Sequence, residues 1–235
     1  SICMKYLQKG SGKGSLLDEF GCLTLAEEVL REYEPGPSER KITARKLVQK
    51  VSAIKNSLDT NGALQREDLP KKLYESYCAA LQQYGVMDYD DILLEALAQA
   101  QSSCQPMESF TYLLVDEFQD INPIQYALLK AWNRAGREIF VIGDPDQAIY
   151  GFRGSDSLCF SRFAEDYAGA KEIHLRKNYR STPEILHCAL PVIQNQHRDA
   201  AFSALEPARN NGGLPRLFLP SDPFSGAVWI AKGIK

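Results

Sequence analysis

Three short segments carry acidic, amide, aromatic and basic side chains at intervals that suit nucleotide chemistry. In the first, Leu-Leu-Val-Asp-Glu-Phe-Gln-Asp (residues 113–120), an apolar run ends in Asp116 and Glu117. Asp116 is suited to hold Mg²⁺ directly or through water, and an adjacent Glu117 that faces the other way can polarise a water molecule for attack on a γ-phosphate. This is the Walker B arrangement. The same pattern also fits a capping or solvated acidic turn, so both interpretations stay open for this segment alone.

The second segment follows the next apolar run and reads Val-Ile-Gly-Asp-Pro-Asp-Gln-Ala-Ile-Tyr-Gly-Phe-Arg-Gly-Ser (residues 141–155). The amide of Gln147 is suited to sense a γ-phosphate by hydrogen bonding. Tyr150 and Phe152 are spaced to stack on the bases of a single nucleic-acid strand, a contact worth about 1–3 kcal/mol per base. The alternative interpretation is a turn with two core aromatics.

The third segment is Leu-Arg-Lys-Asn-Tyr-Arg-Ser-Thr (residues 175–182). In it, Tyr179 can stack on adenine, and Arg180 can neutralise the charge that develops on a transferred phosphate. Pairs of an aromatic residue and an arginine are frequent, so this segment has little weight by itself.

The chain that precedes these segments has the periodicity of helices. Apolar residues at helical intervals predict helices over residues 16–33, 42–58 and 69–84, and a fourth helix capped by Asp88. Asn61-Gly62 predicts a turn. We interpret Asp90 and Asp91, a second pair of acids, as groups that start that fourth helix and pack between domains.

Short apolar runs that alternate with helices follow from about residue 106. Strands are predicted at residues 110–115, 138–144, 170–175 and 214–219. Helices are predicted at residues 123–135, 157–167 and 183–194 and at the end of the chain. Apolar strands that alternate with helices indicate a parallel sheet covered on both faces. Ligands of such sheets bind outside the carboxyl ends of the strands, where both acidic segments lie.

Taken together, the three segments resemble motifs II, III and IV of the UvrD/Rep/PcrA-type superfamily 1 DNA helicases. Met-Asp-Tyr-Asp-Asp-Ile-Leu (residues 87–93) also resembles a segment of that family's helical insertion, and residues 42–58 resemble an earlier helix of it. Residues 215–234 resemble the start of its second motor domain. The resemblance implies an α/β fold: part of a RecA-like P-loop NTPase parallel sheet with a mainly helical inserted subdomain.

The resemblance also implies roles toward ATP and Mg²⁺. Asp116 is expected to hold Mg²⁺ and Glu117 to act as the catalytic base. Gln119 and Gln147 are expected to link the nucleotide state to the grip on DNA.

Further roles follow for the other two segments. The resemblance implies that Tyr179 stacks on the nucleotide base and that Arg180 is the arginine finger. Tyr150, Phe152 and Arg153 are expected to line a path for single-stranded DNA. The expected partners are single-stranded DNA and duplex/single-strand junctions, with movement from 3′ to 5′ along the strand.

Three parts are expected along the chain. Residues 1–105 are a mainly helical insertion subdomain, residues 106–180 the later half of a first RecA-like motor domain, and residues 181–235 the start of a second.

A usable phosphate-binding loop is missing from the sequence. Lys-Gly-Ser-Gly-Lys-Gly-Ser (residues 9–15) departs from the pattern G-x-x-x-x-G-K-[ST], because Gly14 follows Lys13 and Leu7 stands five residues before Gly12. We therefore expect an internal fragment of a helicase that hydrolyses no ATP alone. The alternatives are a non-catalytic DNA-binding or regulatory module that reuses the fold, and the helicase part of a recombination helicase-nuclease.

Composition narrows the class of protein. The 235 residues are 44% hydrophobic and 24% charged, with a net charge of −3, which suits a globular chain and argues against one that coats nucleic acid by bulk charge. The six cysteines form no C-x-x-C pair and no metal-ligand spacing with a histidine, so reduced thiols in a cytoplasmic protein are expected. Any metal should bind carboxylates, and neither a signal peptide nor a membrane span is predicted.

Overall fold

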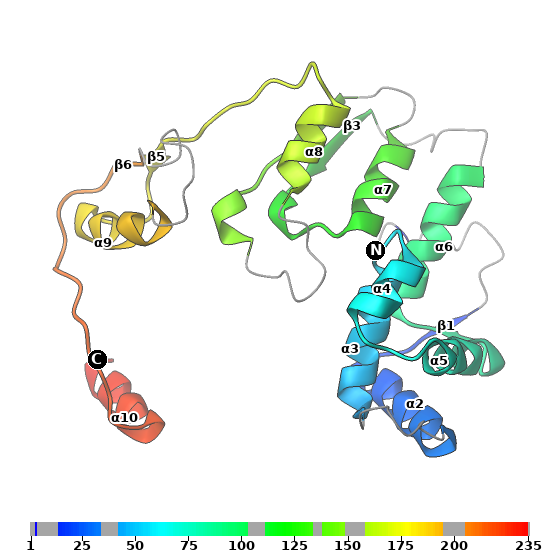
Figure 1. Ribbon diagram of the computed structural model, residues 1–235. Coiled ribbons are helices and arrows are strands. Elements are labelled where there is room, and N and C mark those ends of the chain that lie inside the picture. Colours follow the sequence, from blue (N-terminus) through cyan, green and yellow to red (C-terminus); the bar gives the residue numbers. More distant parts are fainter. Residues whose placement is uncertain are drawn as a thin grey trace. The chain divides into compact units, whose positions relative to one another are not determined.

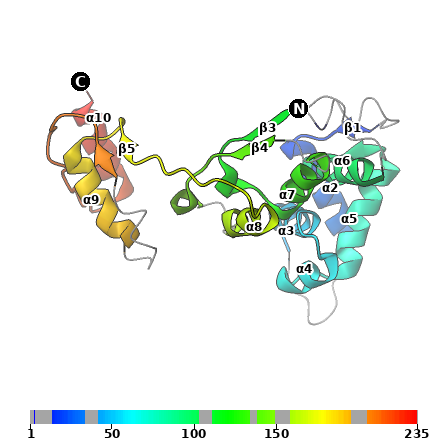
Figure 2. The same cartoon turned by 90° about the horizontal axis from the view of Figure 1, so that it is seen from above.

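The computed structural model describes residues 3, 14–33, 42–102, 111–133, 138–148, 158–194 and 205–234. It is a mixed α/β structure with short parallel strand pairs among many helices (Figures 1 and 2). The chain divides into two compact units, Ser1–Gly169 and Ala170–Lys235. None of the described helices is long and apolar enough to cross a membrane.

The first unit begins with a bundle of helices. Its elements are β1 (Ser15–Leu16), α2 (Glu19–Glu32), α3 (Ala44–Lys55), α4 (Thr60–Arg66), α5 (Lys71–Gln83) and β2 (Val86–Met87). Leucine, valine and isoleucine side chains from α2, α3, α4 and α5 form one apolar core around the fully buried ring of Tyr77. We call this the helical core. β1 pairs in parallel with β2, so the two ends of this bundle lie side by side.

One turn was predicted wrongly within this bundle. Asn61-Gly62 lies inside α4, because the side chain of Asp59 accepts a hydrogen bond from the backbone N–H of Gly62 at 3.0 Å and caps a helix there. The other helices follow their apolar periodicity. α2, α3 and α5 all lie within the predicted ranges.

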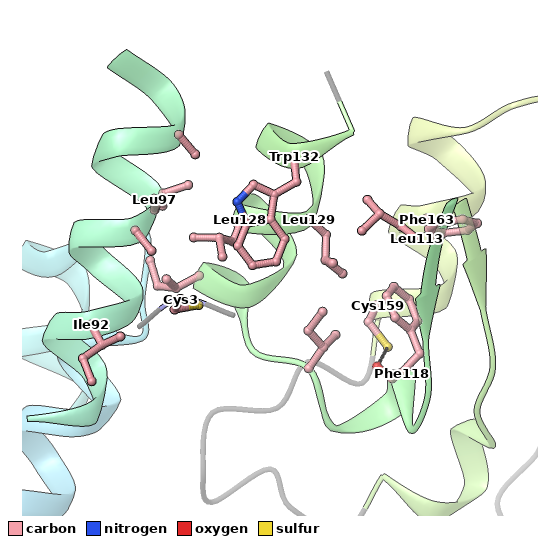
Figure 3. Packing of buried hydrophobic residues seen from close by; sticks show 14 residues of the cluster. Cys3, Ile92, Leu97, Leu113, Phe118, Leu128, Leu129, Trp132, Cys159 and Phe163 are labelled. Atoms are coloured by element: carbon pink, nitrogen blue, oxygen red, sulfur yellow. Dashed lines mark hydrogen bonds between the residues drawn. The ribbon is translucent and has the colours of Figure 1, made fainter. Parts of the chain in front are cut away.

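The rest of the first unit surrounds a second core. Its elements are α6 (Tyr89–Ser102), β3 (Tyr112–Val115), the 3₁₀ turn η1 (Phe118–Asp120), α7 (Pro123–Trp132), β4 (Glu138–Val141), the 3₁₀ turn η2 (Pro145–Gln147) and α8 (Cys159–Asp166). α7 lies between α6 on one side and β3 and α8 on the other, and its Leu128, Leu129 and Trp132 fill the space between them (Figure 3). We call this the sheet core.

β3 and β4 form a two-stranded parallel sheet in which Val115 pairs with Val141. Leu113, Val115, Ile139 and Val141 point into the sheet core, and the alternate side chains of both strands are exposed. Parallel pairing brings the carboxyl ends of both strands to one edge, as the sequence predicted.

The second unit contains β5 (Lys177–Asn178), α9 (Pro183–Gln194), β6 (Glu206–Pro207) and α10 (Pro223–Gly233). β5 pairs in parallel with β6, and the rings of Phe218 and Trp229 stack at 4.5 Å between centroids. The strands predicted at residues 170–175 and 214–219 were wrong. Both segments are irregular and largely exposed, because a strand forms only by pairing and neither segment pairs with any described strand.

Candidate functional site

The ends of β3 and β4 are joined by backbone hydrogen bonds that continue past the strands. The N–H of Ile142 donates to the carbonyl of Val115 at 2.8 Å, and the N–H of Phe118 donates to the carbonyl of Ile142 at 2.9 Å. Phe118 is fully buried, and its ring makes edge contacts with Phe160 and Phe163 of α8 at 5.2 and 5.6 Å between centroids. The loop that begins with Asp116 is thereby anchored to the sheet core.

Glu117 has a left-handed backbone conformation, with φ +50° and ψ +45°. A non-glycine residue in that region is uncommon and strained, and such strain concentrates at functional sites. The conformation turns the chain sharply between strand and 3₁₀ turn. Asp116 and Glu117 are both exposed, and the N–H of Glu117 donates to Asp116 Oδ1 at 2.9 Å.

Gln119 connects the two strand ends through its side chain, which is 2% exposed. Its Nε2 donates to Glu117 Oε2 at 2.7 Å, and its Oε1 accepts from the N–H of Asp144 at 3.0 Å. Asp144 in turn accepts at Oδ2 from Gln147 Nε2 at 2.8 Å. Four residues of the two loops therefore form one hydrogen-bonded series, Glu117–Gln119–Asp144–Gln147, in which Asp144 takes part through its backbone N–H on one side and its carboxylate on the other. We call this series the amide relay.

Gly143 makes room for this relay. A Cβ atom at that position would lie 2.3 Å from Gln119 Oε1, 2.9 Å from the backbone N of Phe118 and 3.0 Å from the Phe160 ring. Only glycine lets the second loop approach the first this closely.

The sequence placed Asp144, the acidic end of the second apolar run, near the likely site but assigned this residue no role. The signal was present in the sequence: an acid and a glycine directly after an apolar strand, beside a second strand that ends in acids. Asp144 also accepts at Oδ1 from the N–H of Asp146 at 3.0 Å, which fixes the start of η2.

Tyr179 and Arg180 belong to the second unit and are exposed on a turn after β5. The side chain of Asn178 accepts from the N–H groups of Arg180 and Ser181 at 3.0 and 2.8 Å, and Arg209 Nη1 donates to the Arg180 carbonyl at 3.0 Å. The backbone of Arg180 is therefore held on both sides while its side chain faces outward. Tyr150, Phe152 and Arg153 lie outside the described residues.

Asp90 and Asp91 start α6, as the sequence predicted. Asp88 Oδ1 accepts from the N–H groups of both residues, at 3.1 and 2.9 Å, and caps the helix. Lys55 Nζ lies 2.7 Å from Asp88 Oδ2 and 2.6 Å from Asp91 Oδ1. Among the described residues, no group of three or more potential ligand side chains is arranged to hold a metal ion by itself.

Of the described cysteines, Cys3, Cys22 and Cys159 are buried, Cys78 is half-buried and Cys188 is exposed, and none of these five forms a disulfide. In the sheet core, Cys159 Sγ donates to the Phe118 carbonyl at 3.3 Å, so this thiol supports the loop of the site.

Comparison with known proteins identifies relatives over most of the chain. A family profile described as UvrD/REP helicase N-terminal domain matches residues 4–168. A putative ATP-dependent DNA helicase, YjcD of Bacillus subtilis, is 35% identical over 211 residues, which are 86% of this chain and 28% of the relative.

Two further relatives carry similar names. The ATP-dependent DNA helicase srs2 of Schizosaccharomyces pombe is 34% identical over 164 residues, covering 70% of this chain and 18% of the relative. The ATP-dependent DNA helicase PcrA of Staphylococcus epidermidis is 30% identical over 209 residues, covering 83% of this chain and 29% of the relative. The chain thus spans less than a third of the length of each of these three relatives.

Proposed function

The chain belongs to the UvrD/REP helicase family, and on that premise we propose that it provides the ATP-hydrolysing edge and part of the DNA path of an ATP-driven DNA helicase. The observation that carries the proposal is the amide relay. It joins Glu117, the acid that would act on water, to the amide of Gln147 after the neighbouring strand, through the Gln119 side chain and the backbone N–H and carboxylate of Asp144. A displacement of either loop can therefore be passed to the other through these four hydrogen-bonded residues.

The residues present suit ATP with Mg²⁺. Two exposed carboxylates stand at the carboxyl end of a parallel strand, where nucleotide ligands of α/β sheets bind. Mg²⁺ takes oxygen ligands and keeps several waters, so a single protein carboxylate such as Asp116 is sufficient beside the phosphates. When bound, the metal neutralises charge on the β- and γ-phosphates.

Glu117 is the proposed general base. Its Oε2 accepts from Gln119, which orients the carboxylate, and the exposure of Glu117 lets water reach it. The left-handed backbone at Glu117 turns the chain directly after Asp116. The two acids thus have separate tasks: Asp116 binds and Glu117 moves a proton.

Gln119 and Gln147 are the proposed coupling residues. Gln147 is exposed on η2, next to the stretch that contains Tyr150, Phe152 and Arg153, for which a path for single-stranded DNA remains our proposal. Asp144 passes any displacement of Gln147 to Gln119 and so to Glu117. Nucleotide state and DNA grip would be linked by hydrogen bonds whose lengths respond to both.

The second unit is proposed to supply Tyr179 for base stacking and Arg180 as the arginine finger. The Asn178 and Arg209 contacts support this role, because a finger needs a fixed backbone and a free guanidinium. The finer fold assignment is also a proposal: a RecA-like parallel sheet, with residues 1–105 as helical insertion, 106–180 in a first motor domain and 181–235 in a second. Duplex/single-strand junctions and 3′ to 5′ movement belong to the same proposal.

A chimera tests the proposal directly. Residues 111–148 contain β3, β4 and the complete amide relay, and they would replace the aligned segment of the Staphylococcus epidermidis relative. We expect the chimera to keep ATP hydrolysis within about tenfold of its host. Glu117→Gln should then lower kcat by about 10²-fold or more, the usual loss when a general base is removed.

The matched control is Glu138→Gln, at the opposite end of the same sheet and exposed like Glu117. It should leave kcat unchanged. A folded chimera in which the two substitutions have equal effects would refute the assignment of Glu117. The 235-residue chain itself is expected to hydrolyse no ATP, because its sequence contains no G-x-x-x-x-G-K-[ST] pattern.

A further inference from the structure

A buried polar cluster lies where α3 meets the start of α6. Lys55 is the last residue of α3 and is only 4% exposed, yet its ammonium group contacts two carboxylates, Asp88 and Asp91. Buried charges are retained only when they are paired and hydrogen-bonded. This cluster fixes the end of one helix against the beginning of another.

The next residue extends the cluster toward the site. Asn56 Nδ2 donates to Asp90 Oδ1 at 2.7 Å, and Asn56 Oδ1 accepts from Asn122 Nδ2 at 2.8 Å. Asn56 and Asn122 are 66 residues apart in sequence, and both are at least nine-tenths buried. Both ends of the Asn56 amide are therefore used, which fixes its orientation.

Asn122 starts α7 with a capping box. Its Oδ1 accepts from the N–H of Gln125 at 2.8 Å, and its own N–H donates to Gln125 Oε1 at 3.0 Å. The amide thus caps α7 with its oxygen and reaches Asn56 with its nitrogen. Substitution of the nitrogen alone can separate these two tasks.

Only four residues separate Asn122 from Glu117, and backbone hydrogen bonds tie them together. The N–H of Asp120 donates to the Glu117 carbonyl at 2.9 Å, and the N–H of Ile121 donates to the Phe118 carbonyl at 3.3 Å. The position of Asn122 therefore sets the position of η1, which carries Gln119.

We propose that Asn56 is a positioning residue for Glu117 and Gln119, acting through its hydrogen bond to Asn122. It ties the loop of the site to the Lys55 cluster, so that the loop and the helical bundle share one mechanical connection. The proposal rests on the function proposed above, since it gives Asn56 a purpose only if Glu117 and Gln119 are functional. An apolar contact would fill the same space but would not fix the direction of the loop, whereas a hydrogen bond between two buried amides does.

The test uses the 235-residue chain and the variant Asn122→Ser. Serine caps helices about as well as asparagine, so α7 keeps its start while the donor to Asn56 is lost. Amide hydrogen exchange and the side-chain amide signal of Gln119 in ¹⁵N NMR spectra are the readouts. We expect the N–H groups of Phe118, Asp120 and Ile121 to exchange about tenfold faster, which corresponds to the loss of one buried hydrogen bond. The Gln119 signal should shift.

The control for general loosening is Asn133→Ala. Asn133 is also buried, lies at the other end of α7 and bonds Tyr167 instead of the cluster. It should leave the Gln119 signal and the exchange of η1 unchanged. The N–H groups of α5 report global opening and should stay protected in both variants.

Rescue by a swap of groups gives a second, independent arm. Asn56→Asp alone sets two carboxylates against each other at the 2.7 Å contact with position 90 and should release η1. Adding Asp90→Asn reverses the direction of that hydrogen bond and keeps an oxygen that accepts from Asn122, so the Gln119 signal should return toward its original position.

Two results would overturn the proposal. One is a Gln119 signal that stays in place in both Asn122→Ser and Asn56→Asp. The other is exchange that rises equally in η1 and α5. Neither measurement involves nucleotide or DNA, so failure here would leave the chimera result standing, and an inactive chimera would leave this connection intact.

Discussion

Replacement of Lys55 by methionine removes the cation of the buried cluster while keeping most of the side-chain length. In the unchanged chain, Lys55 Nζ lies 2.7 Å from Asp88 Oδ2 and 2.6 Å from Asp91 Oδ1. After the replacement, these two carboxylates have lost that counter-ion. Burial alone would lower the pKa of Lys55, but the two carboxylates outweigh it and raise that pKa above its ordinary value. Lys55 therefore stays charged in the folded chain, and its replacement removes one full positive charge from the cluster.

The expected cost follows from that geometry. Breaking a buried ion pair by removing one partner typically costs about 3–5 kcal/mol. A smaller part comes from the Tyr77 ring, whose centroid lies 5.8 Å from Lys55 Nζ. Because whole domains are stable by only about 5–15 kcal/mol, this single change should consume a large share of the free energy of unfolding.

Urea denaturation followed by circular dichroism at pH 7 and pH 4 measures that cost. Burial raises the pKa of Asp91, although Lys55 acts against the rise. When the pKa of a carboxyl group is raised in the folded state, the folded protein becomes less stable as pH increases from the ordinary pKa of 3.8 to the raised one. Without Lys55 the pKa must rise further. The deficit of Lys55→Met should therefore be large at pH 7 and clearly smaller at pH 4, where the Asp91 carboxyl group with its raised pKa binds a proton.

Two comparisons make this prediction strict. Lys46→Met changes an exposed lysine of the same helix and should cost less than about 0.5 kcal/mol. Adding Asp88→Asn and Asp91→Asn to Lys55→Met removes the unpaired charges and should restore most of the stability at pH 7. A deficit below about 1 kcal/mol, or one that is equal at both pH values, would refute the reasoning.

Further predictions concern the site and the DNA path. Gly143→Ala should destabilise the chain by about 1–3 kcal/mol in urea melts, because the new Cβ would overlap Gln119 Oε1, and the Gln119 NMR signal should move with it. Glu117→Gly should be more stable than Glu117→Ala by about 1 kcal/mol, since only glycine adopts φ +50° without strain; equal melting curves would contradict the strained backbone. Fluorescence anisotropy should detect weak, salt-sensitive binding of a labelled oligothymidine, and Tyr150→Ala with Phe152→Ala should weaken it by about tenfold or more. Unchanged affinity would place the DNA path elsewhere.

Local patterns in the sequence were sufficient to predict most helices. The helix predicted at residues 183–194 has those bounds in the structure, and α5 lies within the predicted range. The turn predicted at Asn61-Gly62 was wrong because a cap two residues earlier outweighed the preference of the pair. Helix formation depends on neighbours three and four residues away, which a sequence displays directly.

Strands were less predictable because they depend on distant partners. β3 and β4 lie within the predicted runs, but the two other predicted strands are irregular. The pairing between Lys177 and Glu206 joins polar residues that no alternation marks. An apolar run becomes a strand only where the fold places another strand beside it, and the local sequence does not show that partner.

In the candidate site, too, residues marked by a local pattern could be predicted, whereas contacts between distant residues could not. Asp116 and Glu117 could be selected from the sequence because they directly follow an apolar run, and Gln147 because it stands in the polar segment after the next one. The bond from Gln119 to Asp144 spans 25 residues, and no local pattern announces it. The role of Gly143 likewise depends on the side chain that occupies the space beside it.

The pairing of β1 with β2 has a consequence for how this chain can vary. Ser15 and Leu16 lie beside Val86 and Met87, so the chain enters and leaves the helical bundle at adjacent points. A segment with adjacent ends is an exchangeable module: it can be lengthened, replaced or excised without pulling the flanking chain apart. The connection that resists such exchange is polar, since Lys55 and Asn56 would leave with the module while their partners Asp88 and Asn122, which precede α6 and α7, stayed behind. Variation at exposed positions of the bundle should therefore be tolerated, whereas Lys55 and its neighbour Asn56 should resist replacement.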